Sequence, residues 1–234
     1  MIWRSLTCFS FCAATAWAAT VAGQIQVRDS RAEAVLKRKD YSGIVVSLKP
    51  LTGVPAPSTT PAAMNQKGKT FVPHILPVTM GTVVNFPNFD PIFHNAFSSY
   101  NGQIFDVGLY PPGTSRSIRF SKPGVVRVFC NIHPTMSAVI LVLPTPYFTT
   151  TAKDGSFKMD VPPGTYELNV FHERATEQTL QSLSQRIIVT AEGQTIPAIP
   201  VSEAGFLSVP HKDKYGKEYG PPSDDKIIYP GVRN

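Results

Sequence analysis

The segment from Val128 to Met136, VFCNIHPTM, places three side chains that bind soft metal ions at intervals of three residues. Cys130 offers a thiolate, His133 a neutral imidazole and Met136 a thioether, and copper accepts all three. They can reach one ion only if the chain curls into a tight loop, which Pro134 would stiffen, and the run AVILVL would anchor the loop as a strand. The segment therefore indicates a metal site. Zinc is the main rival, but it rarely selects a methionine.

A plainer interpretation is that Cys130 is a small buried hydrophobe, since a lone cysteine before an aliphatic strand often is. The first eighteen residues, MIWRSLTCFSFCAATAWA, argue against it. They carry one positive charge, a short apolar run and the small-x-small ending of a signal peptide, which predicts cleavage after Ala18 and export to the periplasm. Cleavage would remove two of the three cysteines. A lone thiol in an oxidising compartment is a liability unless it is buried or bound.

The composition favours an all-β chain of many short strands. It is 42% hydrophobic and 16% charged, with 22 Pro and 16 Gly. Residues that favour helices at helical spacing are concentrated in 31–39 and 175–183. No stretch after the signal is long enough for a transmembrane helix. The net charge of +6 comes from scattered residues, which fits an acidic protein partner or an anionic membrane better than nucleic acid.

A blue copper site needs a second histidine, and His94 is the best candidate, because it follows the strand-like TVVNF on a loop. The pattern G-x-x-V-x-F-x-N at 81–88, then His94-Asn95, then Cys-x-x-His-x-x-Met at 130–136 resembles the cupredoxins, the small blue copper proteins. The last spacing is similar to that of amicyanin and pseudoazurin, whereas plastocyanin has a longer gap before its methionine. The resemblance covers roughly residues 64–144.

The resemblance implies a Greek-key β-sandwich that holds one type 1 copper ion. Cys130 would be the equatorial thiolate, His94 and His133 the equatorial imidazoles, and Met136 the axial thioether. Asn95 would hydrogen-bond across to the ligand loop and hold the site closed before copper arrives. Electrons would enter or leave near His133, through an apolar docking patch formed by Phe89, Pro91, Ile92, Phe93 and Pro134.

The segment TTTAKDGSFKMDVPPGTYELNV resembles a second family, the carboxypeptidase regulatory-like domain, which is a small transthyretin-like β-sandwich. The strands that usually open that domain lie before the copper unit, so we predict that the cupredoxin is inserted into this sandwich. The alternative is a tandem arrangement, in which residues 21–50 form the first cupredoxin strands. The whole chain is similar to exported bacterial proteins labelled methylamine utilization proteins. The predicted order is a signal peptide (1–18), first sandwich strands (19–50), a Pro-rich linker (51–63), the cupredoxin (64–145), the rest of the sandwich (146–206) and a polar, solvated tail (207–234).

These features predict a periplasmic electron carrier that cycles between Cu(I) and Cu(II), with a cytochrome or a periplasmic oxidoreductase as its partner. Copper handling without redox turnover, or an interaction module that a metal stabilises, are the alternatives. We expect no enzyme, since the sequence has no His-x-His motif and no second cysteine near Cys130. His74, His172 and His211 are not expected to be ligands, and the last two are expected to face solvent.

Overall fold

The computed structural model describes residues 18–53, 55–56, 60–99, 102–208 and 210–220. The predicted signal peptide, apart from Ala18, and the end of the predicted tail lie outside these residues. The described chain is nearly all β, as predicted, and its two short helices fall in the two stretches that favour helix. None of the described helices has the length and apolar character needed to cross a membrane.

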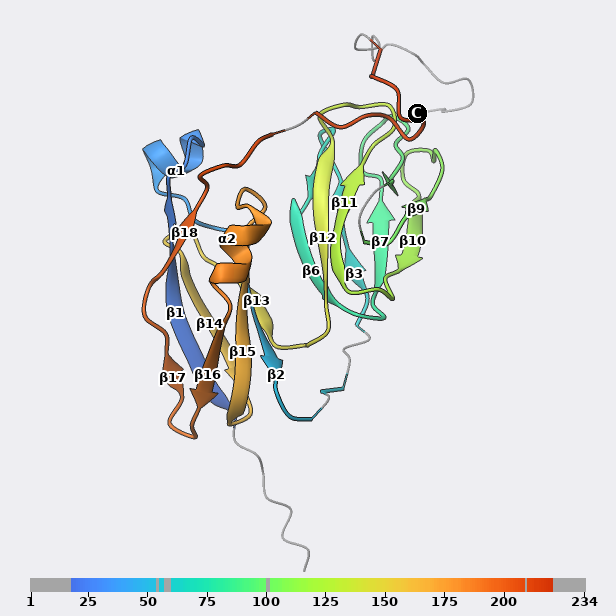
Figure 1. Ribbon diagram of the computed structural model, residues 1–234. Helices are drawn as coiled ribbons and strands as arrows, with labels where there is room; N and C mark the ends of the chain where they lie inside the picture. Colours follow the sequence, from blue (N-terminus) through green and yellow to red (C-terminus); the bar gives the residue numbers. More distant parts are fainter. Residues whose placement is uncertain (1–17, 54, 57–59, 100–101, 209, 221–234) are drawn as a thin grey trace, which may run out of the picture.

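One group of strands comes from both ends of the described chain, and we call it the flanking unit (Figure 1). It consists of β1 (Ala19–Arg28), α1 (Glu33–Arg38), β2 (Val45–Pro50), β13 (Phe148–Thr150), β14 (Ser156–Val161), β15 (Gly164–Phe171), α2 (Glu177–Ser182), β16 (Gln185–Val189), β17 (Gln194–Thr195) and β18 (Ile199–Ser202). β1 pairs with β14, β17 and β18, and the second sheet has the order β13-β2-β15-β16. Fully buried aliphatic residues such as Ile25, Leu48 and Val201 form the core of this unit.

The strands between β2 and β13 form the central unit. They are β3 (Ala62–Ala63), β4 (Asn65–Gln66), β5 (Phe71–Val72), β6 (Ile75–Thr79), β7 (Val83–Pro87), β8 (Phe97–Ser98), β9 (Phe105–Asp106), β10 (Ser115–Arg119), β11 (Gly124–Phe129) and β12 (Ser137–Leu143). One sheet has the order β10-β7-β3 and the other β6-β12-β11-β8-β9, while β4 and β5 pair separately. Phe86, Phe120 and Ile140 are among the buried residues of its core.

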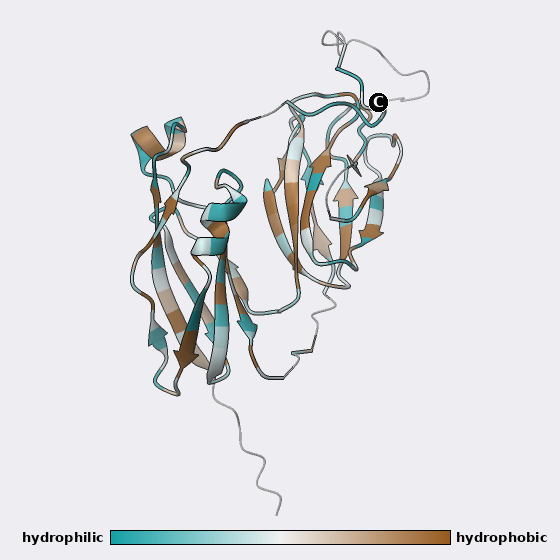
Figure 2. Cartoon of the chain, in the orientation of Figure 1, coloured by the Kyte–Doolittle hydropathy of each residue, from teal (hydrophilic) through white to brown (hydrophobic). Residues whose placement is uncertain are grey.

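β12 explains why the run AVILVL is apolar at every position. Successive side chains of a strand point to opposite faces. Ala138 and Ile140 face the core of the central unit, whereas Leu141 and Leu143 pack with Val45 of the flanking unit in a smaller apolar cluster. Both faces of β12 are therefore covered, and the strand that follows the ligand loop is held rigidly. Figure 2 shows apolar residues along the strands of both units and a mostly hydrophilic α2.

Two local features of the central unit concern where its strands begin and end. Residues 69–78 contain two strands, β5 and β6, which pair with different partners, β4 and β12. Pro73 lies between them and has no amide hydrogen to continue a ladder. The end of the predicted linker is also not free, since Ala62 and Ala63 form β3 and pair in parallel with β7.

Candidate metal centre

The ligand loop is the connection of a β-hairpin. β11 ends at Phe129 and β12 begins at Ser137, and these two residues face each other in the antiparallel register. Within the loop, the amide of Cys130 donates to the carbonyl of Met136 at 3.2 Å, and the amide of Met136 donates to the carbonyl of His133 at 3.0 Å. The chain therefore curls tightly, and Cys130 Sγ lies 3.6 Å from His133 Nδ1.

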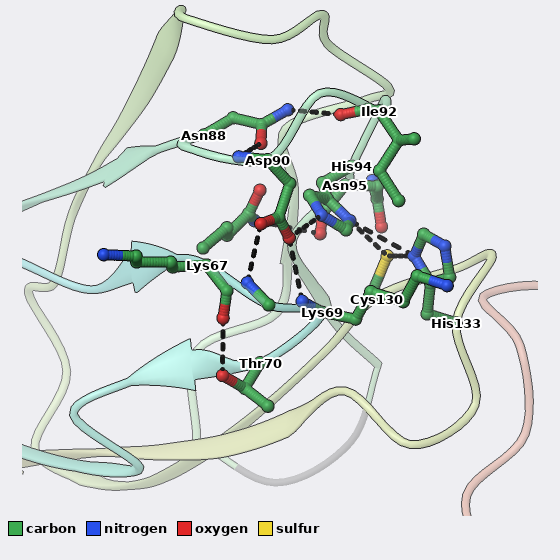
Figure 3. A network of polar contacts seen from close by, with 12 residues as sticks. Lys67, Lys69, Thr70, Asn88, Asp90, Ile92, His94, Asn95, Cys130 and His133 are labelled. Atoms are coloured by element: carbon green, nitrogen blue, oxygen red, sulfur yellow. Dashed lines mark hydrogen bonds and ion pairs between the residues drawn. The ribbon is translucent and has the colours of Figure 1, made fainter. Parts of the chain in front are cut away.

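His94 reaches the same point from the loop that follows β7. Its backbone is fixed, because its amide and carbonyl both pair with Tyr110, at 3.2 and 2.9 Å. Its Nδ1 lies 3.1 Å from His133 Nδ1 and 3.9 Å from Cys130 Sγ. Figure 3 shows the three side chains converging, and their ligand atoms all lie within 4.8 Å of one another. His94 and Cys130 are fully buried, and His133 is 9% exposed.

These three side chains fit a metal ion by their spacing and by their chemistry. Metal–nitrogen bonds near 2.0 Å and metal–sulfur bonds near 2.3 Å put neighbouring ligand atoms about 3.3 to 3.8 Å apart around one ion. The observed separations of 3.1, 3.6 and 3.9 Å are close to that range. Two imidazoles with one thiolate are the trigonal set of a blue copper site. The arrangement could hold one soft metal ion.

Asp90 decides which nitrogen of His94 points inward. Its Oδ2 accepts a hydrogen bond from His94 Nε2 at 2.8 Å, which leaves the Nδ1 lone pair for a metal. The carboxylate also accepts the amides of Gly68 at 2.6 Å and Lys69 at 2.8 Å. Burial alone would raise the pKa of Asp90, but these hydrogen bonds outweigh burial and hold that pKa below its ordinary value. Asp90 is therefore a charged anchor for the ligand ring.

The surroundings keep both imidazoles neutral at pH 7. Burial, and then the neighbouring His94, lower the pKa of His133 to about 4. Burial also lowers the pKa of His94, although Asp90 opposes the shift. Burial raises the pKa of the Cys130 thiol, so the metal-free thiol keeps its proton and a bound metal must displace it. The site can thus bind a metal through two neutral imidazoles and through the thiolate that forms when the Cys130 proton is released.

Met136 and Asn95, which are also predicted for the site, lie in the ligand loop and in the loop that faces it. Met136 is fully buried in the ligand loop and packs in the core of the central unit. Asn95 lies across from the loop, and its Oδ1 accepts the amide of Asn131 at 3.2 Å. Its Nδ2 donates to Asp106 Oδ1 at 2.7 Å and to the Gly108 carbonyl at 3.1 Å.

The residues of the predicted docking patch lie at or near the surface. Phe89 is 63% exposed, Pro91 and Pro134 are also exposed, and Ile92 and Phe93 are half-buried. The Ile92 carbonyl accepts Asn88 Nδ2 at 2.8 Å, which fixes the loop that carries the patch. An apolar surface therefore accompanies the loop of His94.

The three histidines outside the centre contact other groups. His74 Nε2 lies 2.6 Å from Glu173 Oε2. His172 does not face solvent as expected, since it is 12% exposed and lies 2.9 Å from Glu203 Oε1. His211 is also not free in solvent, because its ring stacks on Phe129 with centroids 4.1 Å apart. The charge-rich sequence around these two histidines suggested exposure, but their contacts come from distant parts of the chain.

Sequence reasoning missed two contributors to the centre. Asp90 stands among the apolar residues of NFDPIF, and only its spacing of four from His94 hints at a contact. Two residues of the predicted solvated tail instead contact the ligand loop, since Tyr219 bonds to Cys130 and Lys214 bonds to Asn131. No local sequence pattern in the tail predicts these contacts.

Searches of protein-family models and of curated proteins find no match. Among solved structures, the chain is similar to a copper-containing nitrite reductase (NirK) from Thermus scotoductus SA-01, with 28% identity and a TM-score of 0.35. That likeness covers 41% of this chain and 25% of the reductase, so this chain matches about a quarter of the reductase's length.

Two smaller proteins are matched along nearly their whole length. A purple cupredoxin from Nitrosopumilus maritimus is 22% identical, with 35% of this chain and 99% of the cupredoxin covered and a TM-score of 0.32. The reduced Cu(I) form of a mutant of amicyanin is 15% identical, with 42% and 98% covered and a TM-score of 0.34. At such TM-scores their copper chemistry does not transfer to this chain, and the metal centre depends on its own geometry.

Proposed function

We propose that this protein is a type 1 copper protein that carries single electrons between redox partners. One observation carries the proposal, namely the convergence of His94 Nδ1, His133 Nδ1 and Cys130 Sγ in a buried site on a braced hairpin. In that site, copper would supply a one-electron Cu(I)/Cu(II) couple. His94, His133 and Cys130 would hold it, with Met136 of the same loop as a further soft ligand.

The burial of the ligands favours electron transfer over copper handling. Copper delivery by ligand exchange needs an incoming ligand to reach the ion. His94 and Cys130 are fully buried, and His133 is nearly so, at 9% exposure. Electron transfer requires no such access. Rigid ligands also keep reorganisation small when the oxidation state changes, and the bonds from Asp90 and from the hairpin supply that rigidity.

Further proposals concern the chain as a whole. The flanking unit takes strands from both sides of the central unit, and its β1 pairs with β14 while its β2 pairs with β15. This pairing supports the insertion of the copper-binding unit into a regulatory-like sandwich, rather than a tandem arrangement. We also propose export to the periplasm after cleavage behind Ala18, a redox protein as the partner, and no catalytic activity of the chain itself.

Voltammetry of the copper-loaded protein, expressed from Ala19, separates the candidate functions. Electron transfer predicts a reversible one-electron wave, with the copper content unchanged after repeated cycles. Release of copper in one oxidation state, or its rapid capture by a chelator, would favour copper handling instead. A wave that is absent in a stably copper-loaded protein would favour a stabilising metal in an interaction module. The zinc-loaded protein is the redox-silent control.

A further inference from the structure

The C-terminal residues 211–219, which we call the clamp segment, lie against the back of the ligand loop. Figure 1 shows this part of the chain leaving β18 and passing over the end of β11 and β12. The His211 ring stacks on Phe129, with centroids 4.1 Å apart. The Tyr219 hydroxyl donates to the carbonyl of Cys130 at 2.8 Å. The segment therefore contacts the residue that precedes the predicted thiolate ligand and that ligand itself.

A closed ring of hydrogen bonds joins the clamp segment to the metal centre. Asn131 donates its amide to Asn95 Oδ1, and Asn95 Nδ2 donates to Asp106 Oδ1, at 3.2 and 2.7 Å. Lys214 Nζ donates to Asp106 Oδ2 at 2.8 Å, and the Lys214 amide donates to Asn131 Oδ1 at 2.9 Å. The ring thus connects the loop of His94, β9, the clamp segment and the ligand loop.

The ring of hydrogen bonds and the Tyr219 hydroxyl together fix the Cys130–Asn131 peptide group. The carbonyl of Cys130 and the amide of Asn131 belong to the same planar unit. Tyr219 bonds its oxygen and Asn95 bonds its nitrogen, so that the plane is held from two opposite sides. Rotation of this plane would turn the Cα–Cβ bond of Cys130 and move Sγ, which lies 3.6 Å from His133 Nδ1.

The clamp segment has its own internal structure. Asp213 Oδ1 accepts the amides of Tyr215 at 2.9 Å and Lys217 at 2.8 Å, and the Asp213 carbonyl accepts the amide of Gly216 at 3.0 Å. Gly216 adopts a φ of 77°, which a residue without a side chain takes at little cost. This turn places Lys214 and Tyr219 on the same side, so the clamp segment is preorganised to bind the ligand loop.

We infer that the clamp segment positions Cys130 for copper, with Tyr219 and Lys214 as positioning residues that act through the Cys130–Asn131 peptide. The inference deepens the proposed copper function, but the hydrogen bonds that carry it are present without metal. Outer hydrogen-bond partners of metal ligands contribute about 10- to 100-fold to metal affinity. Loss of either positioning residue should therefore speed the release of copper by about tenfold, the lower end of that range.

The first test needs no metal. Hydrogen exchange of the Asn131 amide is measured by NMR on the full metal-free chain and on the Tyr219→Phe and Lys214→Met variants. Tyr219→Phe removes the hydroxyl that contacts the Cys130 and Lys212 carbonyls and His211 Nδ1, and Lys214→Met removes the bond to Asp106. Since one net hydrogen bond contributes about 1 kcal/mol, the amide should exchange at least about fivefold faster. The Leu48 amide, which donates to the Tyr147 carbonyl in the flanking unit, reports global folding and should not change. Lys217→Met alters an exposed lysine of the same segment and is the matched control.

The second test uses copper. Chelator-driven copper loss and the Cu(II) EPR spectrum are compared for wild type, Tyr219→Phe, Lys214→Met and Lys217→Met. The inference expects about tenfold faster loss and altered copper hyperfine splitting in the first two variants only. Unchanged Asn131 exchange, or unchanged copper loss with wild-type spectra, would overturn it. If wild type shows no thiolate-to-copper band, the proposed function fails, while the exchange experiment still decides whether the clamp holds the loop.

Discussion

Histidine–carboxylate pairs occur in two regions of this protein, and their surroundings differ. At the end of the central unit, His94 and His133 turn their Nδ1 atoms toward each other and toward a thiol, and the carboxylate of Asp90 binds the outer nitrogen of His94. Beside the flanking unit, His74 pairs with Glu173 and His172 with Glu203.

The contrast shows how position decides what a histidine–carboxylate pair does. Asp90 binds Nε2 of His94 and so fixes the tautomer of this ring, which leaves the lone pair of Nδ1 on the side of the Cys130 thiol. Burial then lowers the pKa of His94, and the ring stays neutral. Glu173 instead raises the pKa of His74, mainly through a hydrogen bond, which favours the charged ring. The His94–Asp90 pair leaves a neutral ring that could bind a metal, whereas the His74–Glu173 pair favours an ion pair.

The largest expected effect comes from removing the thiol of the candidate metal centre. Cys130→Ser removes the soft ligand, so copper affinity should fall by more than about a hundredfold, beyond what outer partners alone contribute. Competition with a chromophoric chelator measures this. His172→Gln is the matched control in the flanking unit and should leave the affinity unchanged. Equal losses in both variants would mean that copper binds elsewhere.

A second variant tests the role of the carboxylate behind the ring. Asp90→Asn keeps the size of the side chain but removes its charge. The amide has one acceptor oxygen in place of two, so it cannot accept all the hydrogen bonds from His94, Gly68 and Lys69. Copper affinity should fall about 10- to 100-fold. The same chelator competition applies, with thermal unfolding of the metal-free variant as a folding check. Wild-type copper affinity in Asp90→Asn would show that the backbone of the His94 loop orients the His94 ring without Asp90.

The matching change in the flanking unit should affect folding but not copper. Glu203 is buried and binds His172, Arg174 and Ser30 at 2.8 to 3.0 Å. Glu203→Gln leaves some of these groups with weaker partners, which should cost about 1 to 2 kcal/mol in the free energy of unfolding. Urea unfolding measures that cost. A changed copper affinity in this variant would contradict the separation between the two pairs.

The smallest effect concerns the pH dependence of the His74–Glu173 pair, which links the two units. The pKa of His74 is raised, so its contribution is complete below pH 6.5 and is lost as pH rises through its folded pKa. The pKa of Glu173 is lowered, so its contribution is present above pH 4.5 and is lost as pH falls through its folded pKa.

The pair should therefore stabilise the protein most between about pH 4.5 and 6.5. The His74 side chain is 52% exposed, and solvent screening limits the contribution to less than about 1 kcal/mol. Urea unfolding of wild type and His74→Gln at pH 5.5 and pH 8.5 tests this. The difference between the two proteins should shrink at the higher pH, and a difference that grows would reverse the assigned sign.

The candidate centre could be proposed from the sequence because its candidate ligands lie in two short stretches. The spacing of Cys130, His133 and Met136 between two apolar strands defines a hairpin loop, and the strand before His94 places it nearby. Bonds between distant segments could not be predicted in the same way. Asp90 is fixed by amides more than twenty residues away, and Tyr219 reaches Cys130 across 89 positions.

Visible and EPR spectra of the Cu(II)-loaded protein, recorded beside Cys130→Ser, test the central claim most directly. A thiolate in the equatorial plane predicts an intense blue charge-transfer band and small copper hyperfine splitting, both lost in the variant. A colourless or ordinary tetragonal Cu(II) spectrum, unchanged by Cys130→Ser, would contradict the assignment of His94, Cys130 and His133 as a type 1 copper site.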